Sequence, residues 1–459
     1  MVLTIHVVRQ GGHHYYVHDL VPGRAEDGLV AGEEPGAWSG SGASLLGLSG
    51  PVESSHFAEV LEGRDPWSGR ALRISRRDRS SAGFDLTFAA PKSVSLLHLL
   101  APGELATAAG TGHQVAVADA LDYLAREGVG VRRVRRGEVA FLATTGPVAG
   151  QFLHRTSRAL DPHLHTHLVL ANVAQGVDGG WSSVDSRRLH THLPAAQSVY
   201  HARLRFELGD RMGAAWRLRP SGMGDVIGVE GGLCRLFSQR TASMDEYRYR
   251  CVGGVERTPG AFYADRTPGA FSAERTPGAF YADRPEKDRS VTVDQLMDRW
   301  RQRAADLGFD LGDLTRTVGR QRHDPEPAID QGRLRHQLVE LTSAHRTVGR
   351  HHVVAAVAAS TPGGAVGRDV ETVAARLLDT CGVSDGLSNG HAARWDPSAL
   401  VRTVDSRGFD RVTGASDSPG RGGAPADRSR SVSDLVGRTD RCHQVDGPEL
   451  RTRSLGLER

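Results

Sequence analysis

The feature that most constrains the fold of this chain is a set of three histidines at alternate positions in a mostly apolar run. His163, His165 and His167 stand in the segment PHLHTHLVLAN. Residues two apart in a β-strand project from the same face, so a strand here would present three imidazole rings side by side. Neutral imidazole binds Zn, Mn, Fe, Co or Ni, and three histidines leave coordination positions open. The pattern predicts either an open metal site or a strand with an exposed histidine face.

The first 250 residues have the mixed character of a globular α+β domain. FDLTFAA at 84–90 and LHTHLVLANV at 164–173 are typical of strands, whereas the alanine-rich segment 104–127 has helical spacing and few breakers. Strands and helices are therefore interleaved in an α+β pattern.

Composition changes along the rest of the chain predict three further regions. A nine-residue unit of the type RTPGAFYAD is repeated over 257–283, which is too short a period for a solenoid and indicates a loop insertion within a first domain spanning 1–320. Residues 291–320 are amphipathic and are expected to pack back on that domain. A small helical region follows at 321–405. The tail 406–459 is poor in apolar residues, so we expect disorder there.

Charge and cysteine content decide little about function. The net charge is +3, and all bases except Lys92 and Lys287 are arginines, which suit phosphate recognition but also follow from a bias in genome composition. The sequence contains no run of about 18 apolar residues and no secretory signal, so we expect a cytoplasmic protein without membrane insertion. The cysteines are widely spaced and are expected to be free thiols: Cys234, Cys251, Cys381 and Cys442.

Two more motifs supply groups that a metal-dependent reaction would need. Tyr15 and Tyr16 are adjacent, and no other tyrosine follows until Tyr123. A phenol has a pKa of about 10, so it becomes a nucleophile only where a base or cation favours the phenolate. A tyrosine pair is otherwise a packing or surface feature. Asp85 interrupts an apolar strand, where a carboxylate needs a partner such as a metal-bound imidazole.

Four motifs in order resemble those of the TrwC/TraI-type conjugative relaxases, the MobF family of HUH endonucleases. They are the adjacent pair Tyr15 and Tyr16, GAWSGSGASLLGLSGPV at 36–52, FDLTFAAPKSVSLL at 84–97, and FLHRTSRALDPHLHTHLVLANV at 152–173. The resemblance runs over about residues 1–250 and resumes at 291–320. It implies the relaxase fold, a palm-like central antiparallel sheet with flanking helices. In this sheet we expect the strand of Asp85 to lie next to the strand of His165, because the implied catalytic groups must converge.

The resemblance also changes the set of metal ligands. The family pattern reads His, then Thr-Ser-Arg, then Asp-Pro-x-Leu-His-Thr-His, so the implied ligands are His154, His165 and His167 on two strands. His163 fills the variable position, although strand spacing alone would select it, and it stays the alternative ligand. The implied cofactor is one divalent ion, Mg, Mn or Zn.

The remaining roles follow from the same motif match. Tyr15 is implied as the primary nucleophile with Tyr16 beside it, and Asp85 orients a ligand histidine or takes the tyrosine proton. Lys92, on the turn after the Asp85 strand, is a possible phosphate contact or a surface lysine. The implied reaction is cleavage and rejoining of single-stranded DNA at a transfer origin, with an adjacent hairpin, through a 5′-phosphotyrosyl intermediate. Other proteins of a transfer complex are possible partners.

Departures from the family leave other functions open. Residues 17–40 lack the second tyrosine cluster that many such relaxases carry, and neither lysine stands in a Walker A context, so we expect no helicase region and no ATPase. Together with the repeat and the tail, this favours as an alternative a degenerate relaxase that binds DNA without cutting it. A rolling-circle replication initiator with the same chemistry is a second alternative. A zinc hydrolase that uses water is a third, but it gives no role to Tyr15.

Overall fold

The computed structural model describes residues 3–9, 35–73, 81–135, 137–157, 159–239, 291–318, 329–344, 348–381 and 397–405. The described residues belong to one compact unit. Three predicted features lie outside them, namely the tyrosine pair, the nine-residue repeat and the tail 406–459. Within the described ranges, no helix has the length and apolar character needed to cross a membrane.

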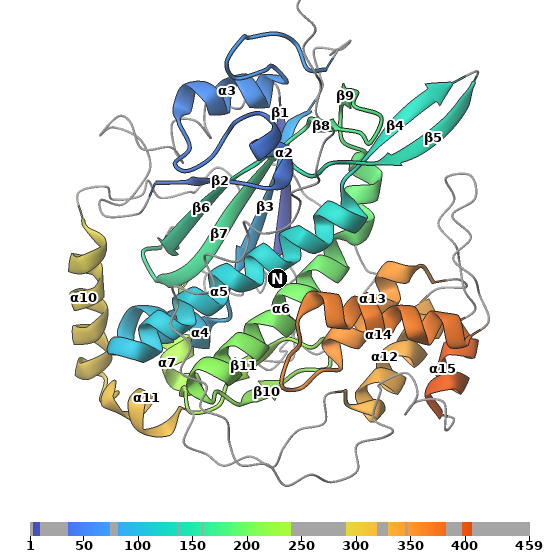
Figure 1. Ribbon diagram of the computed structural model, residues 1–459. Helices are drawn as coiled ribbons and strands as arrows, with labels where there is room; N and C mark the ends of the chain where they lie inside the picture. The colour runs from blue at the N-terminus through green and yellow to red at the C-terminus, as the bar shows by residue number, and fades with distance from the viewer. Residues whose placement is uncertain are drawn as a thin grey trace, which may run out of the picture. The chain divides into compact units, whose positions relative to one another are not determined.

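A five-stranded antiparallel sheet forms the centre of the fold, as predicted (Figure 1). Its strands follow the order β1-β3-β7-β6-β2, so the strand of Asp85 is hydrogen-bonded to the strand of His165. The predicted neighbourhood of these two strands is therefore confirmed. The strands are β1 (Leu3–Arg9), β3 (Ser81–Ala89), β7 (Pro162–Ala171), β6 (Ala149–Thr156) and β2 (Ala37–Ser39).

Two long helices cover one face of the sheet, α5 (Gly103–Tyr123) and α6 (Ser186–Met212) (Figure 1). The alanine-rich segment predicted as a helix is α5, which continues into one π-helical turn, η1 (Leu124–Gly128). Small residues let the two helices approach closely, since a Cβ on Gly112 would lie 2.4 Å from Leu208. The even-numbered residues of β7 from Leu164 to Leu170 face this side and are fully buried.

The opposite face of the sheet is covered by α2 (Ser41–Leu45) and α3 (Ser54–Glu62). A second apolar cluster forms there, in which the rings of Phe57 and Phe152 pack edge to face at 5.5 Å. Val169 and Ala171 of β7 belong to this cluster. Because side chains alternate along a strand, the odd-numbered histidines of β7 project to this side as well.

Short strand pairs surround the sheet. The ribbon of β4 (Gly130–Arg135) and β5 (Glu138–Ala143) projects from the body in Figure 1. Arg133 of β4 connects this ribbon to the loop between β8 (Ala174–Gln175) and β9 (Trp181–Ser182). Its guanidinium donates two hydrogen bonds to the Asp178 carboxylate, at 2.8 and 2.9 Å. The other pair is β10 (Trp216–Leu218) with β11 (Gly224–Val226), followed by α7 (Gly231–Leu236).

Residues 291–318 pack back on the first domain, as the amphipathic pattern of 291–320 predicted. It forms α10 (Val293–Asp306) and α11 (Gly312–Thr317). α10 begins at a capping box in which Thr292 and Gln295 satisfy each other's backbone N–H groups. Trp300 is buried, and its indole N–H donates to the Leu160 carbonyl at 2.8 Å.

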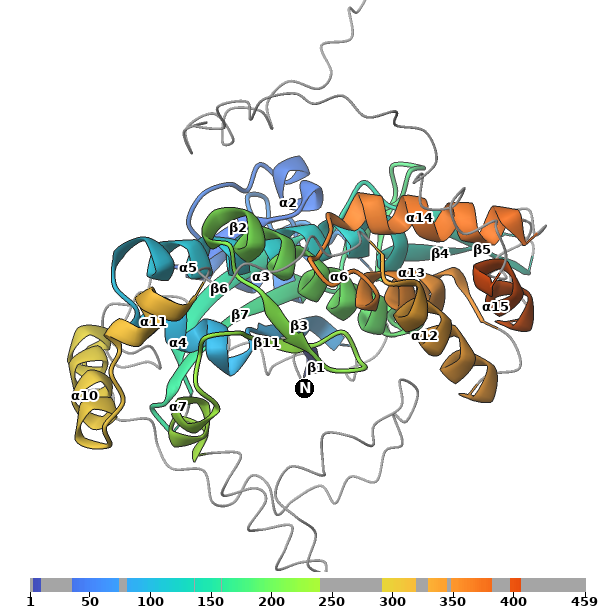
Figure 2. The same cartoon turned by 90° about the horizontal axis from the view of Figure 1, so that it is seen from below.

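Four helices follow, where the small helical region was predicted, and Figure 2 shows them gathered beside α6. They are α12 (Gln331–Ala344), α13 (Arg350–Ala359), α14 (Gly367–Thr380) and α15 (Pro397–Asp405).

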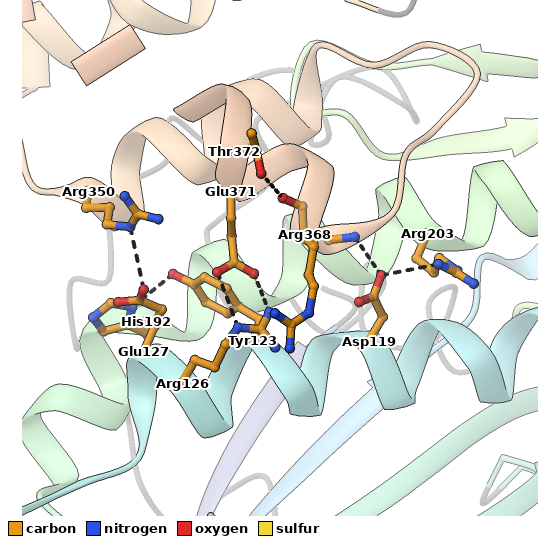
Figure 3. Close-up of polar contacts among 11 residues, drawn as sticks. Asp119, Tyr123, Arg126, Glu127, His192, Arg203, Arg350, Arg368, Glu371 and Thr372 are labelled. Atoms are coloured by element: carbon orange, nitrogen blue, oxygen red, sulfur yellow. Dashed lines mark hydrogen bonds and ion pairs between the residues drawn. The ribbon is translucent and has the colours of Figure 1, made fainter. Parts of the chain in front are cut away.

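Polar contacts fasten these helices to α5 and α6 (Figure 3). Glu371 of α14 accepts hydrogen bonds from the guanidinium of Arg126, and the N–H of Gly367 donates to the Asp119 carboxylate at 2.7 Å. The buried Arg205 of α6 donates to the Ala358 carbonyl at 2.8 Å. The helical region is therefore attached to the same helices that support the sheet.

Candidate metal centre

A hairpin with an irregular turn brings histidines from two strands together. β6 and β7 are antiparallel neighbours, and their register sets His154 directly opposite His165. The register shifts after His154, and the turn passes through Leu160, whose φ of 55° lies in the left-handed region. Within the turn, the N–H of Ser157 donates to the Asp161 carbonyl, and the N–H of Asp161 donates to the Ser157 hydroxyl. The motif spacing thus places His154 beside His165 on one face of the sheet.

The rings of His154, His165 and His167 form a nearly equilateral triangle. Their centroids are 5.3, 5.1 and 5.2 Å apart. One ligand nitrogen from each ring lies within 4.8 Å of the others, and in the described part of the chain no other group of three His, Cys, Asp or Glu residues converges in this way. His163 lies on the same face, but its ring stacks on that of His165 at 4.6 Å. The structure brings together the set that the motif pattern implied.

Asp85 orients His167 from the neighbouring strand β3. Both carboxylate oxygens lie 3.0 Å from Nδ1 of His167, and the Asp85 side chain is buried. Because an ionised carboxylate only accepts hydrogen bonds, Nδ1 carries the proton and Nε2 keeps its lone pair for a metal. Thr87 reinforces this arrangement, since its hydroxyl lies 3.2 Å from the same Nδ1 and 3.4 Å from the carboxylate.

His165 is held in the same tautomer by a different contact. Its Nδ1 lies 2.9 Å from the His163 carbonyl oxygen, which only accepts, so Nδ1 carries the proton and Nε2 is again bare. Burial, reinforced by the neighbouring imidazoles, holds the pKa of His165 well below its ordinary value. Neutral imidazole is the form that binds metals. The donor set therefore fits a divalent ion that accepts nitrogen ligands.

Lys92 binds the chain's own turn at the start of the histidine strand. It is the first residue of α4 (Lys92–Leu100), and its ammonium donates to the Pro162 carbonyl at 2.7 Å. Burial lowers the pKa of Lys92, and the nearby charge of Asp161 opposes this shift. Asp161 in turn accepts hydrogen bonds from both the backbone and side-chain amides of Gln239. These contacts fix the turn, while a phosphate contact by Lys92 stays a prediction.

Comparison with known proteins identifies the family. The sequence model of the TrwC relaxase family matches residues 9–307, about two thirds of the chain. The chain belongs to the TrwC relaxase family. Multifunctional conjugation protein TraI of Escherichia coli is 34% identical over 194 residues, which are 41% of this chain and 10% of TraI. The TraI protein of strain K12 is 37% identical over 164 residues. This chain therefore matches only about a tenth of the length of these curated relatives.

Solved structures of TrwC share the fold. A metal-bound complex of conjugative relaxase TrwC with oriT DNA is 30% identical, with a TM-score of 0.56, and the match covers 67% of this chain and 99% of that one. A copper-bound TrwC complex is 31% identical with a TM-score of 0.55. A complex with a 27-mer DNA that comprises the recognition hairpin and the cleavage site is 28% identical with a TM-score of 0.53. The family resemblance found in the sequence motifs is confirmed, and so is the predicted relaxase fold.

Sequence reasoning named the residues that the structure brings together in the candidate metal centre but missed two supporting residues. Thr87 could have been found, because it stands two residues after Asp85 and must share its face of the strand. His113 left no signal, since a single histidine in an alanine-rich helix has no pattern to interpret. It reaches the histidine strand only in the tertiary structure, where its Nε2 lies 2.8 Å from the Thr166 hydroxyl. The assignment of Tyr15 and Tyr16, outside the described residues, stays a prediction.

Proposed function

We propose that this chain is a relaxase that cuts and rejoins single-stranded DNA at the origin of a transferable element. The observation that carries the proposal is the triangle of neutral imidazoles, oriented by a buried carboxylate, in a chain of the TrwC family. We take 1–320 as the relaxase domain and 321–405 as a small helical region; the tail 406–459 lies outside the described residues. The DNA of such an element lies in the cytoplasm, so the proposal places the protein there.

In this proposal His154, His165 and His167 hold one divalent ion. When bound, the ion supplies positive charge to the non-bridging oxygens of the scissile phosphate, where negative charge increases in the transition state. Asp85 accepts the Nδ1 proton of His167 in a hydrogen bond and so directs Nε2 toward the ion. Imidazole donors favour Mn²⁺ or Zn²⁺ over Mg²⁺, which prefers oxygen ligands.

Tyr15 is the proposed nucleophile. Its phenolic oxygen forms a bond to phosphorus as the bond from phosphorus to the 3′ oxygen breaks, which leaves a 5′-phosphotyrosyl enzyme and a free 3′-hydroxyl that receives the proton. The phosphodiester is conserved, so the reverse attack rejoins strands without a nucleotide cofactor. Because Asp85 is buried and committed to His167 and Thr87, we assign it to orienting the ligand rather than to taking the tyrosine proton.

The proposed DNA partner is a transfer origin with a hairpin beside the cleavage site, as in the TrwC complexes. The β4–β5 ribbon suits the duplex part, since a two-stranded ribbon fits the major groove of DNA. Its register puts Arg132 and Phe141 on the same face as the exposed Val134 and Val139. That face offers a cation for phosphates and apolar groups for thymine methyls. Proteins of a transfer complex remain proposed partners.

The test is a covalent adduct assay with a labelled oligonucleotide from the cognate origin, in the presence of Mn²⁺. We expect wild-type protein and Tyr16→Phe to form the adduct, and Tyr15→Phe to form none while it still binds the oligonucleotide. Tyr15→Phe removes only a hydroxyl, so ring packing is preserved. Adduct formation by Tyr15→Phe but not by Tyr16→Phe would move the nucleophile by one residue.

The same assay separates the alternative functions. Binding without any adduct in wild-type protein would support the degenerate, non-cleaving relaxase. Adduct formation on a replication origin, but not on a transfer origin, would support a rolling-circle initiator.

A further inference from the structure

A chain of buried hydrogen bonds supports the histidine strand from the side opposite the candidate metal centre. Thr166 lies between His165 and His167, so its side chain projects to the other face of β7, toward α5 and α6. It is fully buried in the main core. Its hydroxyl lies 2.8 Å from Nε2 of His113, a fully buried residue of α5. The strand that carries two candidate ligands is thus fastened to α5 at the residue between them.

A second bond extends this support to α6. Nδ1 of His113 lies 2.8 Å from the hydroxyl of Tyr200, which is also fully buried. Burial lowers the pKa of His113 to about 3 and raises the pKa of Tyr200, so the imidazole stays neutral and the phenol keeps its proton. A neutral imidazole donates through one nitrogen and accepts through the other. Both ring nitrogens of His113 are therefore engaged, and its ring orientation is determined.

This arrangement differs from ordinary core packing. A histidine, a phenol and a threonine hydroxyl are costly to bury, and apolar groups of the same shape would be neutral or more stable. What they add is direction, because hydrogen bonds specify position where apolar contacts allow sliding. A shift of β7 against α5 would lengthen the bond between Thr166 and His113. The same shift would displace the nitrogens of His165 and His167.

We propose that His113 and Tyr200 are positioning residues for the metal centre, which act through the Thr166 hydroxyl to hold the two ligands of β7 in place. This inference rests on the proposed function, since it requires that the histidine triangle binds a divalent ion. Outer partners of metal ligands typically contribute about 10- to 100-fold to metal affinity. His113 acts one bond further away, so we expect its loss to weaken binding by about three- to tenfold.

The chain offers a matched control on the same two helices. Tyr123 of α5 and His192 of α6 form a second buried pair, with the Tyr123 hydroxyl 2.9 Å from Nδ1 of His192. The partners of this pair lie on the helices, because His192 bonds to Tyr123 and packs against His351 of the helical region. Tyr123→Phe and Tyr200→Phe each remove one hydroxyl from a tyrosine–histidine pair. Only Tyr200→Phe affects the chain that ends at Thr166.

The experiment titrates the full-length protein with Co²⁺ and records the visible absorption of the bound ion, which reports ligand geometry. Urea unfolding without metal measures stability in parallel. Thr166→Val and His113→Asn remove the bond to the strand and should weaken Co²⁺ binding about three- to tenfold with an altered spectrum. His113→Gln places an amide where Nε2 stood and should restore most of the affinity. Tyr123→Phe should lose comparable stability but keep wild-type affinity and spectrum.

Each result decides between a positioning role and a merely structural one. Wild-type Co²⁺ affinity and spectrum in Thr166→Val and His113→Asn would overturn the proposal, whatever their stability. If His113→Asn fails to fold, Tyr200→Phe, which lacks a single oxygen atom, supplies the same comparison with Tyr123→Phe. Two results would show that the proposed metal centre itself is wrong: no Co²⁺ binding by the wild-type protein, or the same Co²⁺ affinity in wild type and in His165→Ala. The positioning role would then be wrong as well.

Discussion

A single carboxylate determines which nitrogen of His167 carries the proton. Asp85 is 3% exposed, and an unpaired charge so deeply buried would be costly. The hydrogen bond to Nδ1 of His167 compensates for this burial and leaves the lone pair on Nε2. His165 reaches the same tautomer through a backbone carbonyl, so the two candidate ligands of β7 are oriented by groups of different charge.

The four clustered histidines should differ sharply in importance. His165→Ala removes one of three candidate ligands, so we expect loss of adduct formation by at least about 100-fold and a similar loss of Mn²⁺ affinity. His163→Ala removes only a stacked ring and should change both by less than about threefold. The checks are the adduct assay and a Mn²⁺ titration. A severe loss in His163→Ala, with His154→Ala unaffected, would favour the three alternate histidines of one strand.

At the scale of elements, a buried guanidinium joins α6 to the helical region. Arg205 is 2% exposed and donates to the carbonyls of Gly222, Ala358 and Thr361 at 2.6, 2.8 and 3.1 Å. The Gly222 carbonyl lies in the turn between β10 and β11, and the other two carbonyls lie at the C-terminal end of α13. Carbonyls at the end of a helix have no backbone N–H partner within that helix. One side chain thus satisfies backbone groups of two elements that meet α6.

Replacing Arg205 with Leu should destabilise the protein. The Gly222 carbonyl loses its donor, whereas the carbonyls of Ala358 and Thr361 keep hydrogen bonds from the Thr361 hydroxyl and the Gly364 N–H. One unsatisfied buried group costs about 1–3 kcal/mol, so we expect a loss of this size in the free energy of unfolding. Urea unfolding followed by circular dichroism measures the change. The control is Arg301→Leu, which removes an exposed ion pair with Asp298 and should cost under about 1 kcal/mol. Equal losses in both variants would contradict this account.

For the whole molecule, buried histidines set the response to acid. His113, His192 and His201 each have a pKa lowered to about 3, chiefly by burial. Their pKa in the unfolded chain is about 6.5, so the unfolded state binds protons first as the pH falls. The stability that their neutral forms contribute is present above about pH 6.5 and is lost progressively toward pH 3.

The free energy of unfolding should therefore fall steeply below pH 6.5. Each of the three histidines should remove about 2 kcal/mol between pH 7 and pH 5, because a shift of one pKa unit corresponds to about 1.4 kcal/mol. Urea unfolding at several pH values measures the slope. His201→Gln has no titrating group at that position, so its loss of unfolding free energy between pH 7 and pH 5 should be smaller by about 2 kcal/mol. An unchanged slope in this variant would show that other groups cause the acid response.

The sequence by itself determined the local patterns and the family. Period-two histidines in β7, an apolar strand around Asp85 and the helical spacing of α5 are properties of neighbouring residues, so they could be interpreted without coordinates. The set His154, His165 and His167 followed from the family motif rather than from geometry.

Tertiary structure decided how these groups meet. The irregular turn after His154 sets it opposite His165, and the pairing of β3 with β7 brings Asp85 to a residue 82 positions away. The same packing turns Lys92 toward a backbone carbonyl and His113 toward Thr166. These contacts depend on which strands pair, in which register, and on which face a helix lies. Strand pairing, register and helix placement depend on the burial of the whole core, so no short segment of the chain determines them.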